Sequence, residues 1–138
     1  MDITLVKLDT ANPQHARVVA QLILMSELSY GEDLERDSRL LAWREGRGQW
    51  MVAVVGGRAA GVAMVEQHGD AAELVWLEVL PAFKGKGIGK ALLAHIQGVA
   101  EQLIISSVRG ALAFYAKVLE MTPTEDGRFV WTKGARYA

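Results

Sequence analysis

The sequence predicts one α/β (α+β) domain over residues 1–138, in which strands and helices alternate along the chain. Segments with apolar residues at every second position alternate with segments whose apolar residues recur at helical spacing. Clusters rich in glycine, asparagine and aspartate separate these segments, as turns require. The length of 138 residues and the hydrophobic content of 51% are sufficient for one domain with a substantial core.

The first half of the chain predicts a strand, two helices and a hairpin. Asn12 is suited to cap a helix and Pro13 to occupy its first position, which sets the start of the first helix. The expected elements are a strand at Ile3–Leu8, helices from Pro13 to about Ser29 and from about Asp33 to Glu45, and hairpin strands at Trp50–Val55 and Ala59–Gln67.

The second half predicts further strands around two more helices, one of which carries Phe114 and Tyr115. The expected elements are a strand at Ala72–Leu80, a helix from near Gly87 to Val99, a strand at Leu103–Val108, a helix near Ala111–Lys117, and a closing hairpin of Met121–Glu125 and Arg128–Val130. An exposed strand edge at Arg128–Val130 would allow a homodimer.

The most informative segment is the glycine and lysine turn that joins the strand ending at Leu80 to the helix after Gly87. Glycines let the backbone approach a ligand, and the amino end of a helix favours negative charge, so the turn predicts a site for phosphates. A nucleotide P-loop does not fit, because Gly85 and Gly89 enclose only three residues and Ala91 replaces the required Ser or Thr. A dinucleotide-binding turn does not fit either, because Lys90 stands at the position of its third glycine.

Composition restricts the partners. A net charge of −1 from 15 basic and 16 acidic residues gives no general reason to bind nucleic acid or membrane, so Lys84, Lys86 and Lys90 are assigned to one small anion. No apolar run approaches a membrane span and no leader pattern is seen, which predicts a cytoplasmic protein. The sequence has no cysteine, and its three histidines are far apart with no acid at ligand spacing, so we expect no metal.

From Trp76 to Leu93 the chain resembles the pyrophosphate loop of the GNAT-superfamily N-acetyltransferases. That loop reads Arg/Gln-x-x-Gly-x-Gly/Ala after a strand ending apolar-x-Val-x-Pro, and Lys84 stands here at the Arg/Gln position, where it keeps the charge but loses the planar guanidinium. Downstream, Ala111–Lys117 resembles the Ala-x-x-Phe-Tyr-x-Lys helix that lies beside the thioester in this family.

The resemblance implies a GNAT fold, with a central mixed, mostly antiparallel sheet of six to seven strands flanked by four helices. It implies direct transfer of an acetyl group from acetyl-CoA to a primary amine, without a metal. Pantetheine would lie where the strand ending at Val79 splays from Leu103–Val108, with the Val79 N–H as oxyanion donor. The implied coenzyme-binding residues are Leu77, Val79, Lys84, Gly85, Lys86, Gly87, Ile88, Gly89 and Lys90.

Two catalytic residues follow from the same resemblance. Tyr115 would protonate the departing thiolate, although it could also be a core aromatic like Phe114. Glu73 is the leading candidate for the general base, since Ala-Glu-Leu-Val-Trp here resembles the Ala-Glu-Ile-Val-Phe of the histone-modifying branch of this family. Glu78 should project from the opposite face of that strand by period-two counting. The base could be Glu73, Glu78 or water.

The acceptor that the resemblance implies is a small-molecule or peptide amine. Acidic residues outnumber basic ones around the expected loop between the first two helices, which favours a cationic acceptor. The acids are Glu27, Glu32, Asp33, Glu35 and Asp37, against Arg36 and Arg39. An alternative is a catalytically silent acyl-CoA-binding module. It is suggested by Lys84 and by two further departures from the family pattern, since family members often have Asn where this chain has Val108 and Gly-Phe where it has Leu119-Glu120.

Overall fold

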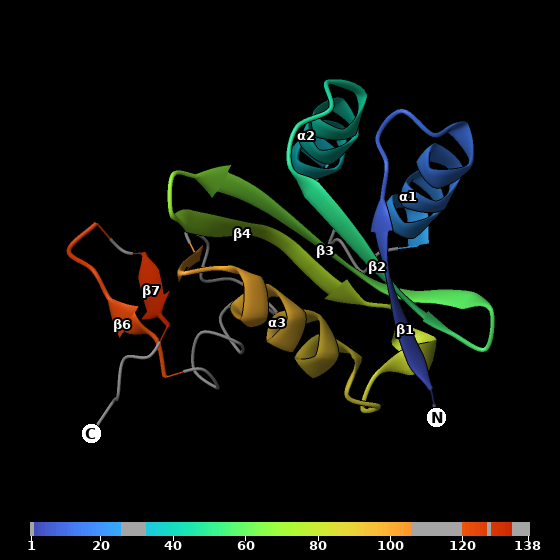
Figure 1. The fold of residues 1–138 in the computed structure, drawn as a ribbon. Helices are drawn as coiled ribbons and strands as arrows, with labels where there is room; N and C mark the ends of the chain where they lie inside the picture. Colours follow the sequence, from blue (N-terminus) through green and yellow to red (C-terminus); the bar gives the residue numbers. More distant parts are fainter. Residues whose placement is uncertain (1, 26–32, 106–119, 127, 134–138) are drawn as a thin grey trace.

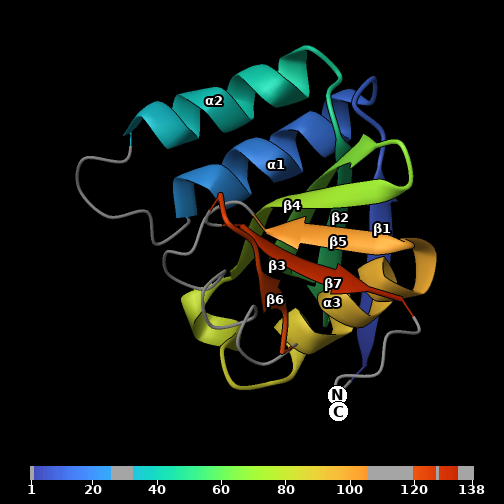
Figure 2. The same cartoon turned by 90° about the vertical axis from the view of Figure 1, so that its left-hand side faces the viewer.

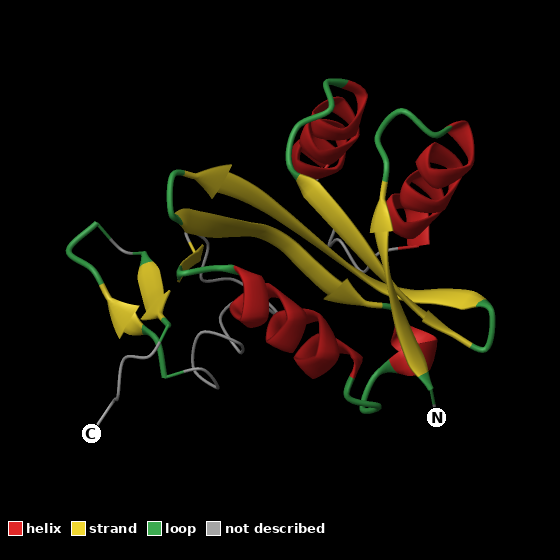
Figure 3. Ribbon diagram, in the orientation of Figure 1, coloured by secondary structure: helices red, strands yellow, loops and turns green. Residues whose placement is uncertain are grey.

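The computed structural model describes residues 2–25, 33–105, 120–126 and 128–133. In this part of the chain a seven-stranded sheet separates α1 and α2 on one face from α3 on the other (Figures 1 and 3). The helices are α1 (Pro13–Met25), α2 (Asp33–Arg44) and α3 (Ile88–Val99), with a short 3-10 helix η1 (Pro81–Phe83). The strands are β1 (Ile3–Leu8), β2 (Gln49–Val55), β3 (Arg58–His68), β4 (Ala71–Val79), β5 (Gln102–Ile105), β6 (Thr122–Pro123) and β7 (Phe129–Thr132).

The strand order, β1-β2-β3-β4-β5-β7-β6, confirms the mixed, mostly antiparallel sheet. Among the strands that the structure describes, only the pair of β4 and β5 is parallel, and α3 connects these two strands. Figure 2 shows β5 beside both β4 and β7. The predicted cap of α1 is also confirmed, because the Asn12 side-chain oxygen accepts a hydrogen bond from the Gln14 N–H at 2.9 Å.

The structure contradicts the prediction of an exposed strand edge near the end of the chain. Residues Phe129 and Val130 of β7 pair with β5 on one side and with β6 on the other, so Arg128–Val130 offers no free edge of the kind we expected. In the described part of the sheet the edge strands are β1 and β6. Residues 26–29, 106–108 and the expected helix at Ala111–Lys117 lie outside the described residues.

Three tryptophans connect α2 to the centre of the sheet. Trp43 of α2 meets Trp50 of β2 edge to face at 5.3 Å between ring centroids, and Trp50 meets Trp76 of β4 at 6.2 Å. Arg39 lies over the Trp76 ring, with its guanidinium carbon 4.7 Å from the centroid. Trp76 therefore marks the face of β4 that is turned towards α1 and α2.

On the other face, α3 packs tightly against the sheet through Ile88, Leu92 and Ile96, which are all buried. Gly61 of β3 lies beneath this helix. A Cβ atom at Gly61 would lie 2.9 Å from the Glu78 carbonyl oxygen and 3.0 Å from Ile88 Cγ2. The absence of a side chain at Gly61 therefore lets the start of α3 approach β3 and β4 closely.

Candidate functional site

The pairing of β4 with β5 ends part-way along both strands. Ala71, Ala72 and Glu73 pair with Gln102, Leu103 and Ile104, but the next residue of β5, Ile105, pairs only with Phe129 of β7. Beyond Glu73, β4 continues to Val79 without a partner on this side among the described residues. The two strands therefore separate, as predicted for the pantetheine channel.

Two residues of β4 direct their peptide groups towards this gap. The Leu80 N–H donates to the Ala60 carbonyl at 2.8 Å, so residue 80 faces β3. Because successive peptide groups of a strand point to opposite sides, the N–H and C=O of Leu77 and Val79 face away from β3. These are the two residues for which the sequence predicted backbone contacts with the coenzyme.

The glycine turn follows directly from this open segment. Gly85 and Gly87 have φ values of +78° and +80°, and nothing lies within 4 Å of a Cβ atom built on either residue. Their requirement for glycine therefore comes from the left-handed backbone and not from a lack of space. The Gly87 carbonyl accepts the first bond of α3 from the Ala91 N–H at 3.1 Å, so the N–H groups of the intervening residues have no partner within the helix.

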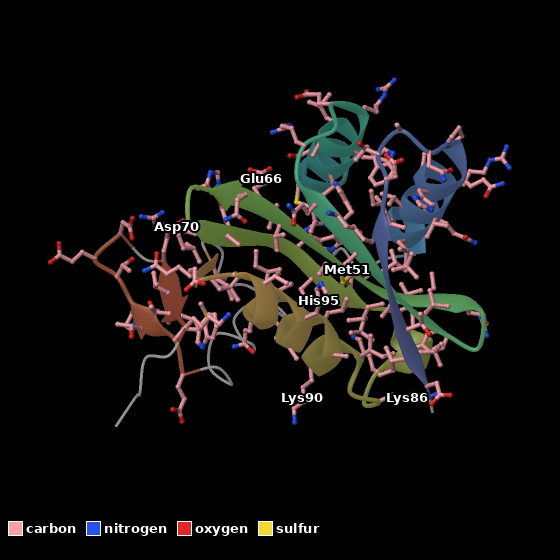
Figure 4. All side chains as sticks on the ribbon, in the orientation of Figure 1. Met51, Glu66, Asp70, Lys86, Lys90 and His95 are labelled. Carbon is pink, nitrogen blue, oxygen red and sulfur yellow. The ribbon has the colours of Figure 1, made fainter. Side chains whose placement is uncertain are left out.

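Basic side chains surround the turn. Lys84, Lys86 and Lys90 are all exposed, and Figure 4 shows Lys86 and Lys90 on the side of the molecule where the turn leads into α3. Lys86 Nζ and the Arg58 guanidinium carbon each lie 5.6 Å from the centre of the buried Phe83 ring. Arg58, at the start of β3, was not predicted from the sequence, because no local pattern places it beside residues 83–90.

A bulge in β4 changes the faces on which Glu73 and Glu78 were expected to lie. Met64 pairs with Trp76 and Val65 with Leu74, so Val75 is an extra residue in β4. Glu73 pairs with Glu66, and Glu78 with Val62. Since positions 62, 64 and 66 share one face of β3, both acids lie on the Trp76 face, and the prediction that they project from opposite faces is wrong.

The surroundings of the two acids differ. Glu78 is half-buried and its Oε1 accepts a hydrogen bond from Trp76 Nε1 at 3.2 Å. Glu73 Oε1 lies 3.2 Å from His68 Nε2, and Glu66 Oε2 lies 4.0 Å from the same nitrogen. The expectation that no acid lies at ligand spacing from a histidine is therefore wrong for His68, since Glu66, His68 and Glu73 form a group that could hold a metal ion.

A separate groove of about 390 Å³ lies between α3 and the sheet. Met51 and Val65 contribute to it from the sheet, and His95 and Val99 from the helix; Figure 4 shows Met51 and His95 close together. None of the predicted coenzyme-binding residues lines this groove. It is therefore distinct from the gap between β4 and β5.

The sequence of residues 19–121 matches the model of the acetyltransferase (GNAT) family. This match covers well over half of the chain. The chain belongs to the GNAT family. It is thus an acetyltransferase that uses acetyl-CoA, which confirms the family and the enzyme class predicted from the sequence. No curated protein matches the sequence significantly.

Solved structures of GNAT proteins share the fold. The ribosomal-protein-S18-alanine N-acetyltransferase of Escherichia coli aligns with a TM-score of 0.69 at 16% identity, covering 99% of this chain and 97% of its own. A GNAT acetyltransferase from Brucella melitensis in complex with acetyl-CoA aligns with a TM-score of 0.69 at 18% identity, covering 99% of this chain and 92% of its own. The PaiA N-acetyltransferase of Thermoplasma acidophilum in complex with coenzyme A aligns with a TM-score of 0.64 at 15% identity, covering 94% of this chain and 97% of its own. At these identities the likeness establishes the GNAT fold alone.

Tyr115, the proposed acid of this GNAT protein, lies outside the described residues, as do the side chains of the acids expected between α1 and α2. Of the charged residues considered there, only Arg39 has a described side chain. Among the described residues, no helix has both the length and the apolar character needed to cross a bilayer.

Proposed function

We propose that this GNAT protein transfers the acetyl group of acetyl-CoA directly to a primary amine, in the gap where β4 separates from β5. The observation that carries the proposal is the end of pairing after Glu73, which leaves the peptide groups of Leu77 and Val79 facing the gap. The same strand leads through η1 into the glycine turn. A ligand with a pyrophosphate at the turn and an extended amide-containing arm along β4 would use both features.

The coenzyme would be held mainly by backbone groups. The N–H groups at the start of α3 and the positive end of its dipole would bind the pyrophosphate, with the lysines of the turn adding charge. Pantetheine amides would pair with Leu77 and Val79, and the Val79 N–H would stabilise the oxyanion. The full proposed set is Leu77, Val79, Lys84, Gly85, Lys86, Gly87, Ile88, Gly89 and Lys90. Ile88 contributes its N–H, since its side chain is buried against the sheet.

Transfer needs a neutral amine and a stabilised leaving group. The amine nitrogen attacks the thioester carbonyl, the carbon–sulfur bond breaks, and the proton lost by the amine passes to a base. We propose Glu73 as this base, because it lies on the face of β4 turned towards α1 and α2, at the point where the gap opens. Tyr115 would supply the proton to the thiolate. Its effect is small, because a thiol with a reference pKa of about 8.5 leaves readily near neutral pH.

The acceptor is proposed to be a cationic small molecule, or a lysine or N-terminal amine of a peptide. We propose that the acceptor binds on the Trp76 face of β4. Two acidic side chains, Glu73 and Glu78, lie on this face and would favour a positively charged ligand. The E. coli relative named above acetylates an alanine of a ribosomal protein, and a peptide amine is therefore one arm of the test. A cytoplasmic location, testable by fractionation, and a homodimer, testable by light scattering, are part of the same proposal. The dimer would form through a surface other than the edge at Phe129 and Val130, since both sides of that strand are paired.

The first test is calorimetric titration with acetyl-CoA, with ATP as the control nucleotide. Selective binding of acetyl-CoA supports the proposed coenzyme cradle, which is the glycine turn, the start of α3 and the backbone of β4 at Leu77 and Val79. Absence of binding overturns it. A screen of primary amines then follows the release of coenzyme A with a thiol reagent, which suits a chain without cysteine. Binding without turnover on any amine, and without hydrolysis, would favour the silent acyl-CoA-binding module instead.

A further inference from the structure

Three potential metal ligands meet at one end of the β3–β4 hairpin. Glu66 and Glu73 stand directly opposite each other in the antiparallel pair, and His68 follows Glu66 by two residues on the same face of β3. His68 Nε2 lies 3.2 Å from Glu73 Oε1 and 4.0 Å from Glu66 Oε2, and all three ligand atoms lie within 4.8 Å of one another. Regular strand pairing, and not a loop, sets this arrangement.

Among the described residues, no lysine or arginine balances the charge of this group. Like charges directly opposite each other on paired strands repel and destabilise the pair. Among the described residues, neither Glu66 nor Glu73 forms an ion pair with a lysine or arginine, and their only recorded partner is His68. Asp70 lies in the turn of the same hairpin and is also acidic (Figure 4). A bound cation would relieve this repulsion.

We propose that Glu66, His68 and Glu73 bind one divalent transition-metal ion of the Zn²⁺ class. Zinc binds imidazole nitrogen and carboxylate oxygen at about 2.0–2.2 Å, which in a tetrahedron places the ligand atoms about 3.4 Å apart. The separations of His68 Nε2 from the two carboxylates lie on either side of that value, and the two carboxylates lie within 4.8 Å of each other, so side-chain movements of about an ångström complete the site. Three protein ligands leave the fourth position to water. Calcium requires more oxygen ligands and magnesium retains its waters, so both should bind more weakly.

The side chains are accessible to an ion from solution. The exposed fractions are 28% for Glu66, 54% for His68 and 30% for Glu73. Because Glu73 is also the proposed base, a bound metal ion would prevent it from accepting a proton, and Zn²⁺ would inhibit acetyl transfer. This regulatory consequence rests on the proposed function, whereas the metal site itself does not.

The test is calorimetric titration of the chain, free of any affinity tag, with ZnCl₂ in the absence of coenzyme. The variants are His68→Ala and Glu66→Gln, and the matched control is His95→Ala, which removes an exposed imidazole on α3 at the other face of the sheet. We expect binding of one ion, weakened at least about tenfold in both site variants, as loss of even a supporting residue costs that much. The control should bind like the parent chain.

The experiments distinguish failure of the metal site from failure of the proposed role of Glu73 as the base. No zinc binding, or equal losses in His95→Ala and His68→Ala, would overturn the metal site whatever the activity of the enzyme. Nuclear magnetic resonance provides a second measurement: Zn²⁺ should shift the imidazole signals of His68 and leave those of His95 unchanged. Zinc binding that leaves acetyl transfer intact would retain the site and overturn the role of Glu73 as the base.

Discussion

Replacing Gly61 by alanine should test how closely α3 must approach the sheet to form the coenzyme site. The added methyl group would lie 2.9 Å from the Glu78 carbonyl oxygen, 3.0 Å from Ile88 Cγ2 and 3.6 Å from Leu92 Cδ1. The first of these atoms belongs to the backbone and cannot rotate away. The strand, the helix, or both must therefore move.

Overpacking of this kind costs about 1–3 kcal/mol. An unfolding entropy of about 2.1 cal/mol/K per residue gives about 0.3 kcal/mol/K for this chain, so the melting temperature should fall by roughly 3–10 °C. The displacement separates the start of α3 from the backbone of β4, which together form the proposed cradle. Acetyl-CoA should therefore bind more weakly to Gly61→Ala than to the parent chain.

Thermal denaturation followed by circular dichroism, together with calorimetric titration, measures both effects. Gly98→Ala is the matched control, because Gly98 lies in α3 with nothing within 4 Å of an added Cβ atom. Alanine there should raise stability, by up to about 0.5–1 kcal/mol, since it is the better helix former. An unchanged melting temperature for Gly61→Ala, alongside the expected gain for Gly98→Ala, would refute the close-approach reasoning.

Four further predictions concern other parts of the chain. Tyr115→Phe should lower turnover by roughly tenfold to a hundredfold at saturating acetyl-CoA, and unchanged turnover would exclude Tyr115 as the acid. Glu73→Gln should flatten the acidic limb of the rate–pH profile without weakening acetyl-CoA binding, whereas the control Glu78→Gln should retain that limb. Glu120 has a φ of +51°, so Glu120→Gly should stabilise the fold by about 1 kcal/mol in chemical denaturation. A hydrogen bond from the Thr124 hydroxyl, and then the charge of Arg128, lower the pKa of Asp126 from its ordinary value of 3.8. Ionised Asp126 therefore stabilises the fold above that pH, and this contribution is lost as the pH falls through the lower pKa of the folded state. Thr124→Val should raise the pKa of Asp126 in an NMR titration.

The parts of the fold predicted well were those with local causes. The cap at Asn12, the glycine turn and the start of α3 depend on the conformational preferences of one to four neighbouring residues, and these are legible in the sequence. The separation of β4 from β5 was predicted through resemblance alone, because no property of residues 71–79 by itself indicates where pairing ends.

The parts predicted badly depend on pairing between distant segments. We expected a free edge at Arg128–Val130, yet Phe129 and Val130 pair with β5 on one side and with β6 on the other. Glu66, His68 and Glu73 become a cluster only when the register of β3 and β4 is known. The pattern Glu-x-His on one strand was a signal that could have prompted a search for a third ligand.

The bulge at Val75 bears most directly on catalysis. Without it, period-two counting would place only one of Glu73 and Glu78 on the Trp76 face of β4, where we propose that the acceptor binds; with it, both lie on that face. Their partners on β3, Glu66 and Val62, are four residues apart, so the two carboxyl-bearing positions are separated by about 13 Å along the sheet. We therefore propose different tasks for the two acids: Glu73, where the gap opens, would act as the base, while Glu78, whose Oε1 accepts a hydrogen bond from Trp76 Nε1, would contact the body of the acceptor.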